Sequence, residues 1–367
     1  MKKKIFLISN SLISLTNLRH EFILKLLDNY DVSLVCPLEP QDEMRFKPFK
    51  EKGCGLIETS FARRSTNPLS ELKLKKLYRR ILKKHMPDLV ITYTIKCNIY
   101  AGMACEKLNI PYMVNITGLG TAFEKNGLLK TISVILYKKA LKKCNTIFFQ
   151  NKQNQKIMEG FGLVRDNAKL VTGSGINTEH FKLLPFPKEG SVGYIFIARI
   201  MKAKGADEFL EAASLMKKKY PDSSFTVLGY CEEDYTDKLK KYEDAGVISY
   251  KGWQEDSIPF LEKSMALVLP SYHEGLSNVC LEASSCGRAI IASDISGCRE
   301  TVDNGVTGFL CKKEDVTDLY DKMEQFYLLP YDRKKEMGLK GREKVSREFD
   351  RNKVIEVYEQ AIEKILG

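Results

Sequence analysis

The sequence has no apolar run of the roughly 18 residues that a membrane-spanning helix needs. Its first residues, Met1 to Ile8, combine lysines with apolar side chains, as a signal peptide does. Polar residues at Asn10, Ser11 and Ser14 break this run, and no cleavage site of small residues follows. We therefore expect a buried first strand here, and a protein that is dissolved in the cytoplasm or bound to a membrane surface.

Clustered cysteines are missing as well. The ten cysteines are scattered along the chain, and no two have the C-x-x-C spacing of metal centres and redox pairs. We expect reduced, mostly buried thiols, as is usual in the cytoplasm. The chain also lacks a convincing D-x-D metal-binding motif. Low-complexity tracts and internal repeats are absent too, and 367 residues are enough for about two ordered domains.

Acidic residues are too few to balance the basic ones, and the net charge is +11. Much of the excess lies in two segments of helical spacing, 72–85 and 128–143. One interpretation is a solvated lysine-rich face on helices that pack into the core. The other is docking on an anionic membrane surface, where each cation contributes about 1 kcal/mol. We do not expect nucleic acid as a partner, because no nucleic-acid-binding motif accompanies the charge.

Short apolar runs alternate with amphipathic stretches along nearly the whole chain, a pattern typical of parallel sheets covered by helices. The alternation restarts after Leu184-Pro185-Phe186-Pro187, where two prolines mark a linker. We therefore predict an α/β protein of two Rossmann-like domains, residues 1–184 and 185–367. Ligands of such sheets bind at the carboxyl ends of the strands, which predicts a site in a cleft between the domains. The last segment, 352–366, reads as an amphipathic helix, which we expect to cross back to the first domain.

One strand–loop–helix segment carries the strongest candidate site. A buried strand ends at Pro270, a loop with Glu274 and Gly275 follows, and a helix begins near Ser277. The backbone N–H groups at such a helix start attract phosphate. Glu274 on the loop can accept hydrogen bonds from sugar hydroxyls. Glu282, about one turn into the helix, can accept them from a ribose.

A second candidate element follows the first strand of the second domain. Arg199 and Lys204 precede Gly205 at the start of a helix. An arginine binds a diphosphate through its planar fork, and a lysine binds it as a point charge. Two solvated surface cations are the alternative interpretation. Gly173 and Gly175, just before the linker, permit a tight turn or a close approach of the backbone to a ligand.

Together these segments resemble the signature of the family 4 retaining glycosyltransferases, which have the GT-B fold. The matching residues are the Glu274-x7-Glu282 pair, Arg199 with Lys204-Gly205, and Gly173-Ser174-Gly175. Three N-terminal segments resemble the branch that extends lipid-linked oligosaccharides in bacterial glycan and capsule assembly, which includes N-acetylgalactosaminyltransferases. They are Thr92–Lys96, Asn115–Phe123 and Phe149–Asn151. The first loop departs from the family, because many relatives have a Gly-Gly pair where this chain has Asn10-Ser11-Leu12-Ile13-Ser14.

The resemblance implies a retaining, metal-independent transfer of a hexose or N-acetylhexosamine from a UDP-sugar to a polyprenyl-diphosphate-linked saccharide. It implies an enzyme at the inner face of the cell membrane, and no cofactor, since the UDP-sugar is a substrate. Glu274, Arg199 and Lys204 would be the catalytic residues, with Glu274 at the donor sugar and the cations at the diphosphate. Further contacts to the donor would come from Gly173, Gly275, Leu276, Ser277, Asn278, Val279 and Glu282.

Single residues give weaker indications. Trp253, the sole tryptophan, follows a strand end and is a candidate to flank the nucleobase, although a packing role is equally open. His20 opens the first amphipathic helix, close to where an acceptor would enter. On the acceptor side we also expect Asn10, Ser11, Gly118 and Gly120.

Two other functions stay open at this point. A UDP-sugar epimerase of GT-B-like fold would use a similar nucleotide site, but the setting of Glu274 and Glu282 argues against it. A non-enzymatic protein that binds nucleotide sugars or a membrane surface would not need carboxylates and cations together in one cleft.

Overall fold

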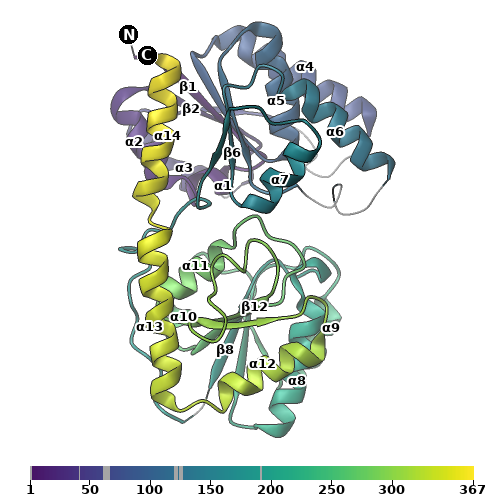
Figure 1. Ribbon diagram of the computed structural model, residues 1–367, viewed down its shortest axis with the longest axis vertical. Helices are drawn as coiled ribbons and strands as arrows, with labels where there is room; N and C mark the ends of the chain where they lie inside the picture. Colours follow the sequence, from purple (N-terminus) through teal and green to yellow (C-terminus); the bar gives the residue numbers. More distant parts are fainter. Residues whose placement is uncertain (1, 41, 61–66, 120–122, 124–126, 191) are drawn as a thin grey trace. The chain divides into compact units, whose positions relative to one another are not determined.

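The computed structural model describes residues 2–40, 42–60, 67–119, 123, 127–190 and 192–367 (Figure 1). They form two compact units, each built on its own parallel sheet. The N-terminal unit contains Met1–Ser174 and Val354–Gly367, and the C-terminal unit contains Gly175–Lys353. The predicted α/β class with two Rossmann-like domains is confirmed.

The border between the units differs from the predicted one. It falls between Ser174 and Gly175 instead of after residue 184, and residues 354–367 belong to the N-terminal unit instead of the second domain. These residues are most of the last helix, α14 (Arg351–Leu366). Its buried side chains join a core of the N-terminal unit: Val354, Ile355, Tyr358, Ala361 and Ile362. The apolar face of α14 therefore crosses back to the first domain, as expected. This packing explains why residues 354–367 belong to the N-terminal unit.

The N-terminal unit has a seven-stranded parallel sheet of order β3-β2-β1-β4-β5-β6-β7. The strands are β1 (Lys4–Ile8), β2 (Asp31–Cys36), β3 (Gly55–Glu58), β4 (Leu89–Tyr93), β5 (Tyr112–Ile116), β6 (Thr146–Phe149) and β7 (Ala168–Leu170). Along β1, Phe6 and Ile8 pack on one side of the sheet, and Ile5 and Leu7 on the other, as the two-residue period of a strand requires. Both faces are thus covered by helices.

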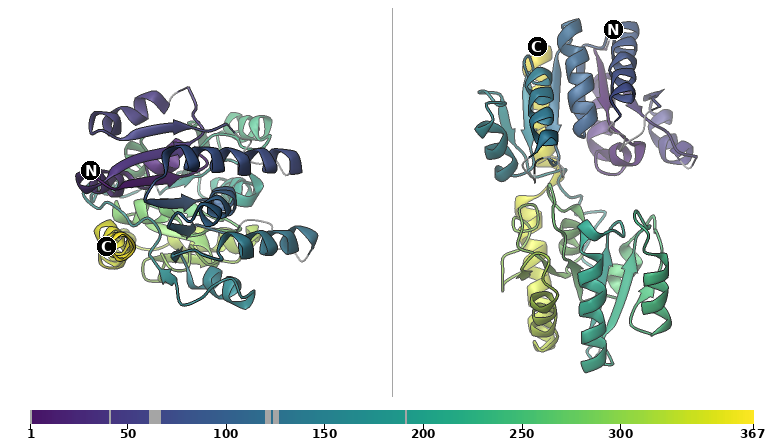
Figure 2. Two further views of the ribbon diagram at one scale, coloured as in Figure 1. Left: turned by 90° about the horizontal axis from the view of Figure 1, so that it is seen from above. Right: turned by 90° about the vertical axis from the view of Figure 1, so that its right-hand side faces the viewer.

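Two helical layers cover this sheet (Figures 1 and 2). One contains α4 (Pro68–His85), α5 (Ile95–Leu108), α6 (Leu128–Ala140) and α7 (Lys152–Gly160). The other contains α1 (Leu12–Thr16), α2 (His20–Asn29), α3 (Asp42–Glu51) and α14. The two basic segments predicted from the sequence are α4 and α6, and each buries one apolar side in the core.

The C-terminal unit has a six-stranded parallel sheet of order β10-β9-β8-β11-β12-β13. The strands are β8 (Gly193–Ile197), β9 (Ser224–Leu228), β10 (Ser249–Tyr250), β11 (Ala266–Leu269), β12 (Ala289–Ser293) and β13 (Gly308–Cys311). The helices are η2 (Lys202–Lys204, a 3-10 turn), α8 (Ala206–Lys219), α9 (Thr236–Asp244), α10 (Ile258–Glu262), α11 (Asn278–Ser285), α12 (Val316–Tyr327) and α13 (Tyr331–Glu348). Because β11 pairs with both β8 and β12, the loops that follow these three strands leave the same edge of the sheet.

All ten cysteines are free thiols, and all but Cys231 are buried, as the scattered spacing predicts. Among the helices of the described segments, none combines the length and the apolar composition that crossing a bilayer requires.

Candidate functional site

Three loops meet at the carboxyl edge of the C-terminal sheet. The loop after β11 is held to the loop after β8 by a hydrogen bond from the Tyr272 N–H to the Ala203 carbonyl, 3.0 Å long. It is held to the loop after β12 by a bond from the Ser277 N–H to the Gly297 carbonyl, 2.8 Å long. These backbone bonds bring the two predicted candidate segments together and add a third that the sequence analysis did not single out.

The first two loops also place a lysine against a carboxylate. Lys204 Nζ lies 2.6 Å from Glu274 Oε1, and the Ser271 hydroxyl donates to the same oxygen at 2.9 Å. The side chains of Lys204 and Glu274 are 18% and 13% exposed. A charge-assisted hydrogen bond in so sheltered a position restricts both side chains. Two of the three residues predicted to be catalytic are therefore direct neighbours.

Two glycines let the three loops approach this closely. Gly205 has a φ of 72°, and a Cβ there would lie 2.1 Å from the Pro270 carbonyl oxygen. Gly297 has a φ of 93°, and a Cβ there would lie 2.7 Å from the Glu274 carbonyl oxygen. A larger residue at either position would have to push the Glu274 loop away. Gly205 was part of the predicted motif, whereas Gly297 was missed because no local pattern marks it.

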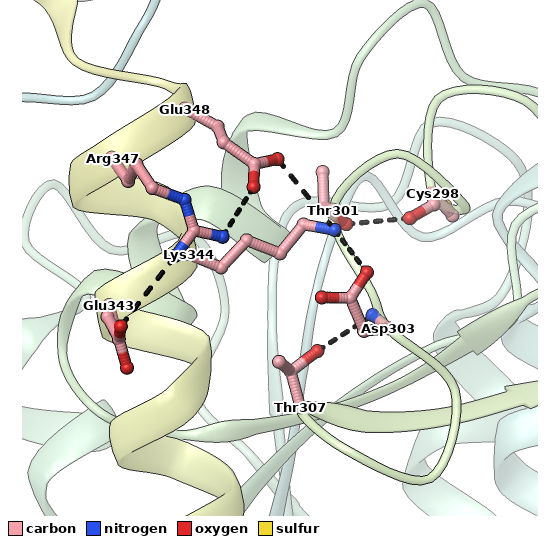
Figure 3. Close-up of polar contacts among 8 residues, drawn as sticks. All are labelled: Cys298, Thr301, Asp303, Thr307, Glu343, Lys344, Arg347 and Glu348. Carbon is pink, nitrogen blue, oxygen red and sulfur yellow. Dashed lines mark hydrogen bonds and ion pairs between the residues drawn. The ribbon is translucent and has the colours of Figure 1, made fainter.

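The third loop is fixed in turn to α13 (Figure 3). The Lys344 side chain extends from that helix to an ion pair with Asp303. The Asp303 N–H donates to the Thr307 hydroxyl at 2.9 Å, and the Thr301 hydroxyl donates to the Cys298 carbonyl at 2.8 Å. This network holds the segment that begins at Gly297, and through it the position of Glu274.

Helix α11 begins directly after the Glu274 loop. Ser277 is its N-cap and accepts a hydrogen bond from the Cys280 N–H at 3.4 Å, as the predicted helix start requires. Asn278 and Val279 form the first turn. The Leu276 side chain is buried against the core of this unit, so only its backbone is placed for a donor contact.

Glu282 lies one turn further into α11 and is half-buried. Burial raises the pKa of its carboxyl group to about 7, although the nearby Arg351 cation opposes this shift. The side chain of Arg351 also donates to the Gly175 carbonyl at 3.3 Å. Sequence reasoning missed Arg351, the first residue of α14, because it belongs to no recognisable motif.

Arg199, the third predicted catalytic residue, precedes the 3-10 turn that carries Lys204. Its side chain is 46% exposed and forms an ion pair with Glu232, whose carboxylate lies 3.6 Å away. Gly173 has a φ of 63° and belongs to the N-terminal unit.

Trp253 lines a hollow of about 360 Å³ near the ends of β9 and β10. Tyr230 and Tyr250 line it too, and both Trp253 and Tyr230 are nearly half exposed. Flat rings can stack on a nucleobase, and the role of Trp253 beside the nucleobase stays a prediction. Tyr230 was not predicted, since a single tyrosine after a strand carries no motif.

The residues predicted on the acceptor side lie in the N-terminal unit. Ser11 is buried and precedes α1, and Asn10 beside it is half-buried. His20 is the first residue of α2, and its ring packs edge-on against Phe49 with 5.0 Å between the ring centres. Gly118 lies after β5 in open surroundings. Gly120 lies outside the described residues.

Both halves of the chain match families of known proteins. Residues 178–344 match the family Glycosyl transferases group 1, and residues 4–151 match the family Glycosyl transferase 4-like. An N,N'-diacetylbacillosaminyl-diphospho-undecaprenol alpha-1,3-N-acetylgalactosaminyltransferase of Campylobacter jejuni is 28% identical over 99% of both chains. A UDP-Gal:alpha-D-GlcNAc-diphosphoundecaprenol alpha-1,3-galactosyltransferase of Escherichia coli is 28% identical over 81% of this chain and 80% of its own.

Solved structures share the fold. Anabaena HepE, in complex with UDP and glucose, covers 99% of this chain and 100% of its own with a TM-score of 0.80 and 14% identity. TarM covers 98% and 99% with a TM-score of 0.77 and 15% identity. The fold is therefore GT-B, as the motifs predict.

Proposed function

The chain belongs to the family 4 glycosyltransferases, and we propose that it transfers a hexose or N-acetylhexosamine from a UDP-sugar to a polyprenyl-diphosphate-linked saccharide. The names of the Campylobacter jejuni and Escherichia coli relatives both specify a sugar that is joined through a diphosphate to undecaprenol. The first relative matches over almost the full length, so its similarity extends to the N-terminal unit, where we expect the acceptor. A product of this kind would serve bacterial surface polysaccharide or glycan synthesis. The family favours transfer over the epimerase and the non-enzymatic alternatives.

The observation that carries the proposal is the Lys204–Glu274 pair next to the start of α11. The N–H groups of the first turn and the Lys204 ammonium provide positive charge for a diphosphate. The Glu274 carboxylate provides an acceptor for sugar hydroxyls on the other side of the pair. Donor diphosphate and donor sugar are adjacent groups, and so are the two side chains proposed to bind them.

We assign the chemistry of the step as follows. The bond between the anomeric carbon and the diphosphate oxygen breaks, and a bond from the acceptor hydroxyl oxygen to that carbon forms on the same face. The proton of the acceptor hydroxyl passes to an oxygen of the departing UDP. Because UDP gains negative charge in the transition state, Lys204 and Arg199 stabilise it more there than in the bound substrate. These fixed cations would supply the charge without a metal ion, so we propose metal-independent transfer.

We propose that the enzyme works at the inner face of the cell membrane, docked through α4 and α6. Apart from its lysines, α6 has four exposed apolar residues at helical spacing, Leu128, Leu129, Ile132 and Ile135. A strip of this kind beside cations suits the interface of an anionic bilayer.

A donor screen tests the function. The purified protein is incubated with a panel of UDP-, GDP- and ADP-sugars and a crude lipid-linked saccharide, and nucleotide release is measured with and without EDTA. We expect release from a UDP-sugar only, dependent on the lipid and unaffected by EDTA. Isomerisation of the UDP-sugar without the lipid would instead identify an epimerase.

A further inference from the structure

A basic hollow of about 350 Å³ lies in the N-terminal unit, lined by residues of α4 and by Lys96 at the start of α5. Its lining residues are Ser60, Ser70, Glu71, Lys73, Leu74, Lys76, Leu77, Arg80 and Lys96. Four of these are cations from two different helices, and Glu71 is the single carboxylate among them. The described walls of the hollow therefore have three more positive than negative charges.

The cations of α4 divide into two sets. Lys73, Lys76 and Arg80 line the hollow. Lys75, Arg79 and Lys83 are equally exposed, but they follow one another on another flank of the helix and do not line it. Neither a solvated helix face nor a general attraction to a membrane requires a cation from a neighbouring helix. The hollow, however, is lined by the first set and by Lys96 of α5.

That fourth cation, Lys96, comes from the first turn of α5, where the helix dipole adds positive potential. It follows Thr94, whose backbone has a φ of 71° and a ψ of 151°. A β-branched residue rarely adopts this conformation, and such strained positions cluster at binding sites. This turn leads into the start of α5, and Lys96 in its first turn lines the hollow.

Lys96 forms an ion pair with Glu71, at 2.8 Å from Nζ to Oε1. Both side chains are half-buried, so the pair is partly shielded from solvent. Glu71 thus acts as an internal counter-ion for one of the four cations. Lys73, Lys76 and Arg80 line the same hollow.

We propose that this hollow binds the diphosphate group of the acceptor, and that the diphosphate competes with Glu71 for Lys96. This rests on the proposed function for the source of the diphosphate, whereas the site itself rests on the four cations. An arginine fork and three ammonium groups match the oxygens of two linked phosphates. The volume is within the range of roughly 300–1,000 Å³ that small-ligand sites have. Ser60 and Ser70 also line the hollow, and the Ser70 hydroxyl donates to the Asn67 carbonyl at 2.7 Å.

A pair of matched triple variants tests the site in detergent solution, where no membrane takes part. One is K73Q/K76Q/R80Q, inside the hollow, and the other is K75Q/R79Q/K83Q, on the same helix and with the same loss of charge. With a short-chain, water-soluble polyprenyl-diphosphate saccharide as acceptor, we expect the first variant to raise the acceptor KM by about tenfold or more, since each ten-fold step needs only about 1.4 kcal/mol. The acceptor KM of the second variant should stay within about twofold of that of the unchanged protein. Neither variant should change the KM for the UDP-sugar. Equal effects of the two triples would overturn the proposal.

A second measurement needs no turnover, so it separates failure of this site from failure of the proposed function. Inorganic diphosphate is titrated calorimetrically into the protein in the presence of saturating UDP, which occupies the donor site. We expect saturable binding by the unchanged protein and by K75Q/R79Q/K83Q, and its loss in K73Q/K76Q/R80Q. If the unchanged protein binds neither inorganic diphosphate nor the water-soluble polyprenyl-diphosphate saccharide, the proposal is contradicted.

The counter-ion role of Glu71 predicts a change of opposite sign. Glu71→Gln removes the competing carboxylate, so the affinity for inorganic diphosphate should rise several-fold. A variant that merely damages the fold cannot tighten binding, and the midpoint of thermal unfolding controls for folding in all three variants. Weaker binding by a folded Glu71→Gln variant would show that the carboxylate does not compete with the anion.

Discussion

Lys204 Nζ lies 2.6 Å from Glu274 Oε1, although 70 residues separate the two in the chain. The lysine follows β8 and the glutamate follows β11, and these strands are neighbours in the sheet. The hydrogen bond fixes a cation and a carboxylate relative to each other at the carboxyl edge, where ligands of α/β sheets bind. A site that must hold a diphosphate and a sugar side by side requires such a preorganised pair.

Removal of the cation should reduce the rate of transfer more than the binding of the donor. In Lys204→Met, we expect kcat to fall by about 10²–10³-fold, the usual cost of losing one group that stabilises developing negative charge. Lys202→Met is the control, because Lys202 is exposed on the same 3-10 turn. Steady-state kinetics with a saturating acceptor measure both variants. Equal kcat values for the two variants would exclude the assigned role of Lys204.

Gly205 should tolerate no side chain. The substitution Gly205→Ala adds a Cβ at 2.1 Å from the Pro270 carbonyl oxygen, in addition to the strain of a positive φ. Gly246→Ala is the control, since Gly246 has a similar φ of 68° and open space around its Cβ. We expect Gly246→Ala to lower the free energy of unfolding by about 1–2 kcal/mol, and Gly205→Ala to lower it further and to abolish transfer. Chemical denaturation measures the free energy of unfolding. If Gly205→Ala and Gly246→Ala lower it by similar amounts, the close packing around Gly205 is contradicted.

Glu282 should make stability depend on pH. Its folded-state pKa of about 7 is raised above the ordinary value of 4.5, so ionisation of this carboxyl opposes folding. The stabilisation by the neutral form is complete below about pH 4.5 and is lost as the pH rises to about 7. Glu282→Gln cannot ionise, so its stability relative to the unchanged protein should rise across this interval and level off above it. Denaturation at a series of pH values measures the difference, and a constant difference would refute the burial of this group.

Membrane docking should have two separable components. K75Q/R79Q/K83Q should weaken sedimentation with anionic vesicles at low salt, and high salt should mask the effect. Replacement of Leu128, Leu129 and Ile132 on α6 by serine should weaken it at every salt concentration, because burial of apolar surface is not screened. Vesicles of neutral lipids control for charge. Unchanged sedimentation of both variants would remove α4 and α6 as the docking surface.

Much of the fold could be predicted from the sequence, because the buried strands that pair in both sheets are mostly short apolar runs. The unit border could not. The sequence analysis allows a tight turn or a close approach to a ligand at Gly173 and Gly175, and it places the border at the two prolines near residue 185. The destination of α14 depends on contacts such as the packing of Tyr358 on Phe22 and Phe148, which are distant in the chain.

The candidate site, like the fold, has residues that the sequence identifies and relationships that only the structure shows. Arg199, Lys204, Glu274 and Glu282 stand in motifs with local context, so each could be found separately. The contact between Lys204 and Glu274 could not be predicted, because it depends on β8 and β11 being neighbours in the sheet. Arg351 and Gly297 act only through neighbours from other segments, and the hollow along α4 exists only once Lys96 of α5 is beside it.

The most direct measurement is the mass spectrum of a defined polyprenyl-diphosphate saccharide after incubation with the protein and one UDP-sugar at a time. We predict that the lipid gains the mass of one sugar residue with a single donor, that UDP is released in equal amount, and that the transferred sugar keeps its anomeric configuration. An unchanged lipid with every UDP-sugar, in a protein that binds UDP, would contradict the proposed transfer.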